Sequence, residues 1–260
     1  MASSFYRSRP DGTFDALPTT GSPWGPDSQH GGPPAALLTR ALEALPEAAG
    51  RVLGRVTLEL LGPVPLGPLS VSAQVERAGR SVALVSATLV DVARDRPVAR
   101  ATGWLFPELE TGAGEVGPPP SAGPSEGVPH DRPQGWHGGY LDAVEWRWLR
   151  GAVGEPGPAL VWMHPRPLLV DDEPWTPATL VMACVDSASG ASSVLDPASW
   201  AFQNTELTVH LLRPPVGEWL CLDARTTLGP GSVGLATSDV YDEQGLVARS
   251  AQALLVARRR

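Results

Sequence analysis

The chain has 260 residues, of which 42% are hydrophobic and 18% charged, and its net charge is −8. This length fits one large domain or two small ones, with enough apolar residues for a sizeable core. The acidic balance argues against a nucleic-acid surface. No apolar run reaches the ~18 residues of a membrane span, and the start MASSFYRSRPDG lacks the apolar run of a signal peptide. We therefore expect a cytoplasmic protein with no nucleic-acid partner and no membrane insertion.

The first half of the chain predicts one helix followed by a run of strands. Residues 1–12 are polar and predicted to be loosely held, whereas FDALPTT (14–20) favours a short strand. A loop rich in Gly (25–32) leads into Pro33-Pro34 and a helix with an apolar stripe, and proline in a first helical turn removes no hydrogen bond. The segments that follow show partial period-2 alternation and predict antiparallel strands over 55–62, 69–78, 81–92 and 97–106.

The second half repeats this order after a segment that cannot bury a core. Residues 107–134 are rich in Pro and Gly and are expected to be a linker. Strands are predicted over 140–151 and 158–169, a helix over 174–190 and a strand meander over 204–256. The expected domains are 1–106 and 135–260, on either side of the linker.

The two halves also share a sequence pattern. Segments 58–106 and 207–256 each read apolar strand, Pro-containing turn, alternating strand, Gly-containing turn, strand, and then Val-Ala-Arg in a last strand. So long a period indicates two copies of a domain-sized unit and not a solenoid. Each copy is an α+β unit, and two such units can pair edge to edge into one sheet with both helices packed on it.

Four motifs resemble those of a known family: HGGPPAALL (30–38), LLGPVPLGPL (60–69), LLRPP (211–215) and LVARSAQ (246–252). Their order, with an Asp in the second helix, resembles the TesB-like acyl-CoA thioesterases over nearly the whole chain. The resemblance implies an α+β double hotdog. In that fold, two helix-plus-antiparallel-sheet repeats form one continuous curved sheet with two central helices.

Asp186 is the first candidate catalytic residue. It ends an otherwise apolar helical run, LVMACVDSASG. A carboxylate there opposes the helix dipole and is costly to bury, so it is either a solvated helix end or a functional acid. The resemblance implies the second, a general base that activates water.

Gln252 is the second candidate. Alignment of the two Val-Ala-Arg motifs sets Gln252 against Gly103. An amide can donate to and accept from a water, although a polar residue facing a sheet edge is the simpler interpretation. The resemblance implies that Gln252 helps to hold the nucleophilic water.

Asn204 and Thr205 compete for one role. The family pattern has a hydroxyl residue two positions before an acid, and the register set by Arg213 places Asn204 there. In a strand, Thr205 points to the opposite face, so only a one-residue shift would exchange the two. Asn204 departs from the family pattern, which leaves open a protein that binds acyl thioesters without turnover.

His30, Gly31 and Gly32 stand at the start of the first helix. Glycines allow close approach of a substrate, and unpaired N–H groups at a helix start can stabilise an oxyanion. In hotdog enzymes the helix start of one unit faces the acid of the other. His30 is interpreted as a pocket wall or a cap of the loop, and the second His-Gly-Gly, at His137, as a turn.

Several other chemistries lack their motifs. The chain has no Gly-x-Ser-x-Gly, no Walker loop, no Gly-x-Gly-x-x-Gly before a helix and no paired metal-ligand motif. Cys184 lies in an apolar run and is expected in the core. A hydratase is disfavoured because hotdog hydratases use an Asp and a His a few residues apart, and no His follows Asp186 within 20 residues.

The sequence thus predicts an acyl-CoA thioesterase that uses no metal or other cofactor. Water activated by Asp186 would attack the thioester directly, and the substrate would be carried by coenzyme A or an acyl-carrier protein. We expect a homo-oligomer. No basic patch for the coenzyme A phosphates is evident, and the candidates are Arg77, Arg80, Arg213 and Arg225.

Overall fold

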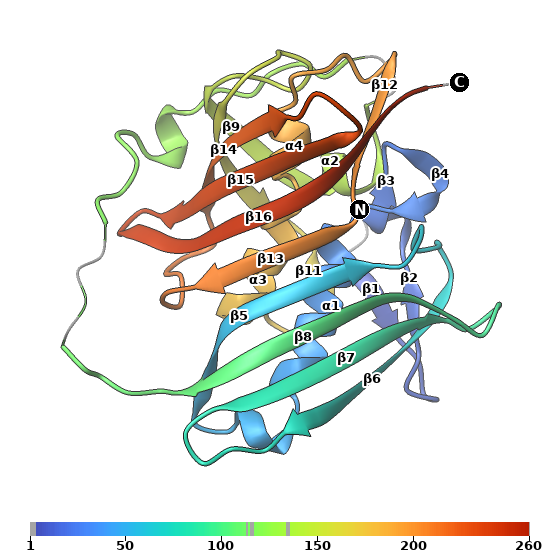
Figure 1. The fold of residues 1–260 in the computed structure, drawn as a ribbon, viewed down its shortest axis with the longest axis vertical. Coiled ribbons are helices and arrows are strands. Elements are labelled where there is room, and N and C mark those ends of the chain that lie inside the picture. The colour runs from blue at the N-terminus through green and yellow to red at the C-terminus, as the bar shows by residue number, and fades with distance from the viewer. Residues whose placement is uncertain (1–3, 113, 115–116, 134–135, 260) are drawn as a thin grey trace.

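A computed structural model describes residues 4–112, 114, 117–133 and 136–259. The predicted domain boundary between residues 134 and 135 lies outside the described residues. Figure 1 looks onto a broad curved sheet, with the helices on its far side. The predicted α+β arrangement of one continuous sheet over two central helices is confirmed.

The first half contributes six strands to a 14-stranded sheet. Its helix α1 (Gly32–Glu43) matches the predicted one. Two short strands, β3 (Gly21–Ser22) and β4 (Gly25–Gln29), form a separate hairpin beside α1. The strands in the large sheet are β1 (Ser4–Ser8), β2 (Phe14–Ala16), β5 (Arg51–Leu60), β6 (Pro68–Arg77), β7 (Ala83–Asp91) and β8 (Arg96–Pro107) from this half, with β11 (Leu168–Val170) from the second half beside β1.

The second half has the same order. Its helices are α2 (Gly139–Ala143), α3 (Pro177–Val185) and α4 (Ala188–Ala191). Its strands are β9 (Val144–Arg150), β10 (Ala159–Pro165), β12 (Trp200–Asn204), β13 (Glu206–Leu211), β14 (Leu220–Leu228), β15 (Val233–Asp242) and β16 (Gly245–Arg258). Single-turn 3-10 helices cover Pro18–Thr20, Pro46–Ala48 and Pro124–Glu126.

The two halves meet at the centre of the sheet, where β5 pairs antiparallel with β13. The strand order is β11-β1-β2-β6-β7-β8-β5-β13-β16-β15-β14-β10-β9. Outward from the centre, β8, β7, β6 and β2 correspond to β16, β15, β14 and β10. Thr57 pairs with Thr208 at the middle of this pattern, and their hydroxyl oxygens lie 3.2 Å apart. The repeat in the sequence is therefore an approximate two-fold axis in the fold.

Helices α1 and α3 pack against each other on one face of the sheet and form the core with it. Leu38 and Leu42 of α1, and Val181 and Met182 of α3, are fully buried. A helix that buries its apolar stripe in this way gains most of its stability from packing. The core fixes where the two helices begin and end, and those ends form the site described below.

The structure differs from the sequence-based expectations in three places. Residues 4–8 form β1 with Phe5 and Tyr6 fully buried, so the predicted loose start is wrong there. The predicted strand over 140–151 begins with the helical turn α2. The helix predicted over 174–190 breaks at Asp186 into α3 and α4. In the second half the pattern of apolar residues was correct but tertiary packing decided the local conformation, whereas at residues 4–8 the buried Phe5 and Tyr6 were not recognised as part of a strand.

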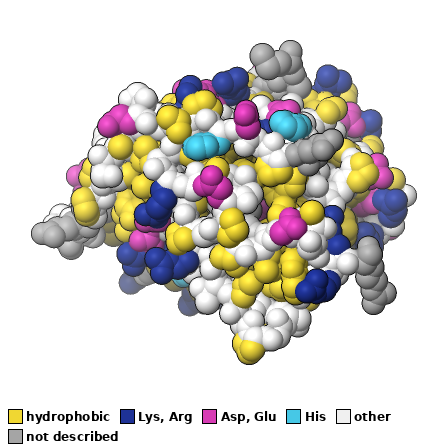
Figure 2. Space-filling model, turned by 90° about the horizontal axis from the view of Figure 1, so that it is seen from above, with side chains coloured by type: hydrophobic (Ala, Val, Ile, Leu, Met, Phe, Trp, Pro, Cys, Tyr) yellow, Lys and Arg dark blue, Asp and Glu magenta, His cyan; other side chains and the backbone are white. Residues whose placement is uncertain are grey.

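The outer surface is mixed in charge. Figure 2 shows acidic and arginine side chains scattered among apolar ones, with no broad basic field on that face. Across the residues that the structure describes, no helix is long and apolar enough to span a membrane.

Candidate active site

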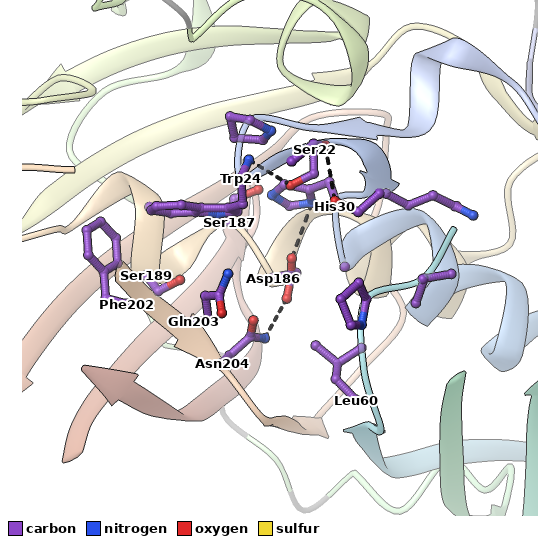
Figure 3. Close-up of a pocket in the computed structure, with 18 of the residues that line it drawn as sticks. Ser22, Trp24, His30, Leu60, Asp186, Ser187, Ser189, Phe202, Gln203 and Asn204 are labelled. Atoms are coloured by element: carbon purple, nitrogen blue, oxygen red, sulfur yellow. Dashed lines mark hydrogen bonds and ion pairs between the residues drawn. The ribbon is translucent and has the colours of Figure 1, made fainter. Parts of the chain in front are cut away.

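A cavity of about 410 Å³ lies where α1 begins, α3 ends and β12 passes. Both halves of the chain contribute to its wall. The polar groups gather at one side around Asp186, and Figure 3 shows this carboxylate between His30 and Asn204. The apolar side of the wall is formed by Trp24, Leu60, Val64, Trp136, Leu141, Trp146, Val153, Phe202 and Leu255.

Asp186 is the C-cap of α3, and only 6% of its surface is exposed. Its own helix disfavours a negative charge at this end. The start of α1 offsets this, because a Cβ added to Gly31 would lie 2.7 Å from both carboxylate oxygens. The carboxylate therefore rests against the positive end of another helix, and only glycine leaves room for it there.

Asn204, the last residue of β12, binds this carboxylate directly. Its Nδ2 donates to Asp186 Oδ1 at 2.7 Å. Thr205 also lines the cavity, but the structure gives no contact between its side chain and Asp186. The Thr205 carbonyl accepts a hydrogen bond from the N–H of Leu60 in β5, and the Thr205 N–H donates to the carbonyl of Ala253 in β16. Of the two alternatives, Asn204 is the one whose side chain reaches the acid.

His30 lies on the other side of Asp186. Its Nδ1 is 3.2 Å from Asp186 Oδ2 and also 3.1 Å from the N–H of Gly32, which donates to it. The two contacts exclude each other, because a nitrogen that carries a proton cannot accept one. Burial lowers the pKa of His30, and the nearby Asp186 carboxylate opposes that shift. The ring is therefore largely neutral at pH 7, and its tautomer decides which neighbour it binds.

Tyr140 holds His30 in place, and the sequence analysis did not identify it. The two rings stack with centroids 3.9 Å apart and 7° between their planes. The Tyr140 hydroxyl donates to the carbonyl of Ala183 in α3 at 2.7 Å. Burial raises the pKa of Tyr140 well above its usual value, so it remains a neutral donor. The one sequence signal was its position just after the second His-Gly-Gly.

The start of α1 offers few free N–H groups. Pro33 and Pro34 have none, Gly32 donates to His30, and Ala35 donates to the carbonyl of Gly31. Within the described chain, the N–H of Gly31 finds no acceptor. Position 32 requires glycine for a steric reason, because any Cβ there would collide with the carbonyl of Ala183. Of the two predicted oxyanion donors, the geometry leaves Gly31 available.

Gln252 is close to the site but does not line the cavity. It is fully buried in β16, and its Nε2 donates to the carbonyl of Asp186 at 3.2 Å. Its Oε1 is buried without a hydrogen-bond partner among the described residues. The side chain thus fixes the backbone at the end of α3, immediately beside the acid.

A second cleft, of about 250 Å³, occupies the position related by the approximate two-fold axis. There the end of α1 meets the start of α3, and Thr176 Oγ1 donates to Glu43 Oε2 at 2.6 Å. Burial raises the pKa of Glu43, which the Thr176 hydrogen bond partly offsets. We call this the counterpart cleft. Its wall is formed by Glu43, Arg51, Val52, Leu53, Glu108, Pro177, Ala178, Leu211, Leu212, Arg213, Pro214 and Pro215.

The chemistry available in the larger cavity is that of an acid, an amide and an imidazole. No group of three or more His, Cys, Asp or Glu side chains within the described ranges is placed to hold a metal ion. Burial raises the pKa of the Cys184 thiol far above neutral, and the residue lies in the core as predicted. A thiol that stays protonated is a poor nucleophile. A carboxylate in an apolar cavity, packed against a helix start where the Gly31 N–H has no acceptor in the described chain, suits proton abstraction from a water.

Comparison with solved structures establishes the fold. The chain is similar to a protein assigned as a thioesterase II from Thermobifida fusca YX, with 20% identity, a TM-score of 0.75 and 98% and 96% of the two chains covered. It is similar to a hotdog-fold protein of unknown function from Alicyclobacillus acidocaldarius, with 19% identity, a TM-score of 0.73 and 97% and 96% covered. It is also similar to the acyl-CoA thioesterase II TesB2 of Mycobacterium marinum, with 13% identity, a TM-score of 0.67 and 98% and 96% of the two chains covered. The predicted double hotdog is confirmed.

Family models match both halves of the chain. The model of the acyl-CoA thioesterase N-terminal domain matches residues 20–106, and that of the C-terminal domain matches residues 124–256. No curated protein sequence matches. The two models together cover most of the chain, and the resemblance drawn from the sequence motifs is confirmed. The chain therefore belongs to the acyl-CoA thioesterase family and is a thioester hydrolase.

Proposed function

We propose that this enzyme hydrolyses acyl-CoA in the larger cavity by direct attack of a water that Asp186 deprotonates. The observation that carries the proposal is the position of the Asp186 carboxylate, held by Asn204 and resting against the glycine start of α1. Burial beside an apolar wall strengthens electrostatic interactions with this carboxylate.

The acyl chain would occupy the apolar part of the cavity, with its thioester carbonyl directed at the N–H of Gly31. Asp186 takes a proton from the water as the water oxygen bonds to the carbonyl carbon. The Gly31 N–H stabilises the resulting oxyanion. When the tetrahedral intermediate collapses, the carbon–sulfur bond breaks and the proton on Asp186 passes to the leaving sulfur. The products are a carboxylic acid and free coenzyme A, and the carboxylate of Asp186 is restored.

The polar neighbours of Asp186 have positioning roles in this proposal. Asn204 occupies one carboxylate oxygen and so directs the other toward the reacting water. Gln252 fixes the carbonyl of Asp186, and its unpartnered Oε1 can accept a hydrogen bond from a water. His30, stacked on Tyr140, walls the site on the far side.

One alternative is favoured by a specific observation. Asn204 stands where the family pattern has a hydroxyl, and its amide already binds the Asp186 carboxylate. A chain that binds acyl thioesters without hydrolysing them would have the same cavity. Turnover separates the two possibilities.

The test is release of free thiol from a panel of acyl-CoA substrates of increasing chain length, including an aromatic acyl group. Asp186→Asn should lower kcat by about 100-fold or more, the usual scale of general-base catalysis. The matched control is Asp223→Asn, which removes an exposed carboxylate that pairs with Arg150 and does not line the cavity. It should leave kcat unchanged.

Thermal unfolding of both variants checks that they fold. Full turnover by folded Asp186→Asn would exclude the mechanism. Binding of acyl-CoA by the wild type without any thiol release would favour the non-catalytic alternative.

A further inference from the structure

Among the residues that the structure describes, none with a positive side chain lines the cavity described above. Each of the 20 positive residues of the chain is an arginine, because the sequence contains no lysine. Coenzyme A carries its phosphates on the nucleotide end, far from the thioester. If the proposed function holds, arginines at the mouth of the cavity would have to meet those phosphates.

Two arginines at the end of β16 lie at this mouth. The guanidinium of Arg259 stands over the ring of Trp24, 5.5 Å from its centroid, and Trp24 lines the cavity. Arg258 stands over the ring of Trp200 at 4.6 Å. Both tryptophans pack against one small apolar cluster around Phe202, which itself lines the cavity.

Hydrogen bonds fix the backbone and the Nε of Arg259, whereas its two terminal guanidinium nitrogens have no partner in the described chain. Its Nε donates to the carbonyl of Trp200 at 3.3 Å, and its backbone N–H donates to the carbonyl of Ser199 at 3.0 Å. Its two terminal nitrogens have no acceptor within the described chain. An arginine fixed in this way loses less freedom when it binds an anion.

Neither arginine is neutralised. No described carboxylate lies within ion-pair distance of Arg258 or Arg259, and both are exposed. Arg213, one of the candidates from the sequence, instead pairs with Asp242 in the counterpart cleft. Arg77, Arg80 and Arg225 line neither cavity.

We propose that Arg258 and Arg259 form a phosphate-binding site at the cavity mouth that recognises the nucleotide phosphates of coenzyme A. Guanidinium groups bind phosphate oxygens through paired, charge-assisted hydrogen bonds. The flanking tryptophans keep the two groups oriented by cation–π contact. This site extends the proposed function, since it sets which carrier of the acyl group is bound.

The test compares one acyl group on two carriers. In the Arg258→Gln/Arg259→Gln double variant, KM for the acyl-CoA should rise about 10-fold with kcat within about twofold, the scale of one or two lost charge-assisted hydrogen bonds. KM for the same acyl group on N-acetylcysteamine, which has no phosphate, should not change. Added salt should raise KM for acyl-CoA in the wild type and much less in the variant.

Arg225→Gln is the matched control. Arg225 is exposed and lines neither cavity. It should leave KM unchanged. An equal rise in this control would show a general effect of charge and overturn the proposal.

Two further outcomes would also overturn the proposal. An equal rise for both carriers would show a structural role, and a rise only for the acyl group on an acyl-carrier protein would assign the rim to that partner. Calorimetric binding of free coenzyme A needs no turnover, and the double variant should bind it about 10-fold more weakly. That measurement decides this proposal even if the wild type hydrolyses no thioester.

Discussion

The two clefts of this molecule have the same architecture and different chemistry. In the larger one, the carboxylate of Asp186 at the end of α3 meets a glycine at the start of α1. In the counterpart cleft, Glu43 at the end of α1 meets Thr176 at the start of α3. Both place an acid against a helix start, as the two-fold arrangement of antiparallel helices requires.

The difference lies in what surrounds each acid. Thr176 caps its own helix and binds the acid with the same hydroxyl, whereas Gly31 leaves its N–H and the carboxylate open to a substrate. Gln252 has Gly103 as its counterpart, and the space beside Gly103 is filled by Leu42 and Leu53. The duplicated fold therefore supplies two acid–helix contacts, and among the described residues the one at Asp186 has the side-chain amides of Asn204 and Gln252 bound beside it.

The substitution expected to affect the Asp186 cavity most strongly is Gly31→Ala. The added Cβ would lie 2.7 Å from both oxygens of Asp186, so the acid must move. We expect kcat for acyl-CoA to fall about 100-fold, since small displacements of catalytic groups carry losses of that order.

Gly190→Ala provides the control in the same cavity, because a Cβ there meets nothing within 4 Å. It should retain wild-type turnover. Equal activity of the two folded variants would contradict the assigned position of Asp186.

A smaller loss is expected from Asn204→Ala. It removes the 2.7 Å hydrogen bond to Asp186 and makes this position apolar, like its counterpart Leu53. Loss of one hydrogen bond to a charged group predicts about a 10-fold lower kcat. Asn204→Thr, which restores the family hydroxyl, should retain more activity than Asn204→Ala.

Gln203→Ala serves as the comparison, since its exposed side chain lines the same cavity and has no contact with Asp186. Steady-state thiol release measures all three. A larger loss in Gln203→Ala would mean that Asn204 does not orient the acid.

The smallest effect should come from Glu43→Gln in the counterpart cleft, which should leave kcat unchanged and alter stability only. Burial raises the folded-state pKa of Glu43 above its ordinary 4.5. Below pH 4.5 the carboxyl is protonated in both states, and above it the unfolded chain releases its proton first. Folding stability of the wild type thus falls as the pH rises toward the folded-state pKa.

The Glu43→Gln variant has no carboxyl to titrate, so its folding stability does not fall in this pH range, and its side-chain oxygen can still accept a hydrogen bond from Thr176. Its melting temperature should exceed that of the wild type by roughly 2 °C at pH 7 and match it at pH 4. Thermal unfolding across this range measures the difference. A constant offset at all pH values would mean that Glu43 does not titrate as described.

The sequence predicted the central part of this structure well. Alternation and the duplicated Val-Ala-Arg strands predicted the sheet, and the acid in an apolar helix singled out Asp186. The sequence could not place Tyr140, because its stacking on His30 depends on α2 and the start of α1, which meet only in the folded chain. The same is true of Arg259, whose relation to Trp24 arises from the end of β16.

The role of Gln252 shows a different limit. Alignment with Gly103 identified it as a departure from symmetry, but a strand pattern gives no information about what a buried amide contacts. In the structure it binds the backbone of Asp186 and does not line the cavity. These assignments need distances between segments far apart in the sequence, which local periodicity does not contain.

The pairing of β1 with β11 has a consequence for biosynthesis. Ser4 lies beside Leu168 in parallel register, so β1 has no partner on that side until β11 has been made, more than 150 residues later. Asn204 and the end of β16 come later still. The cavity therefore cannot assemble before β12 has been made, and a nascent chain released before that point would expose one edge of β1 and the edge of β5 that β13 covers.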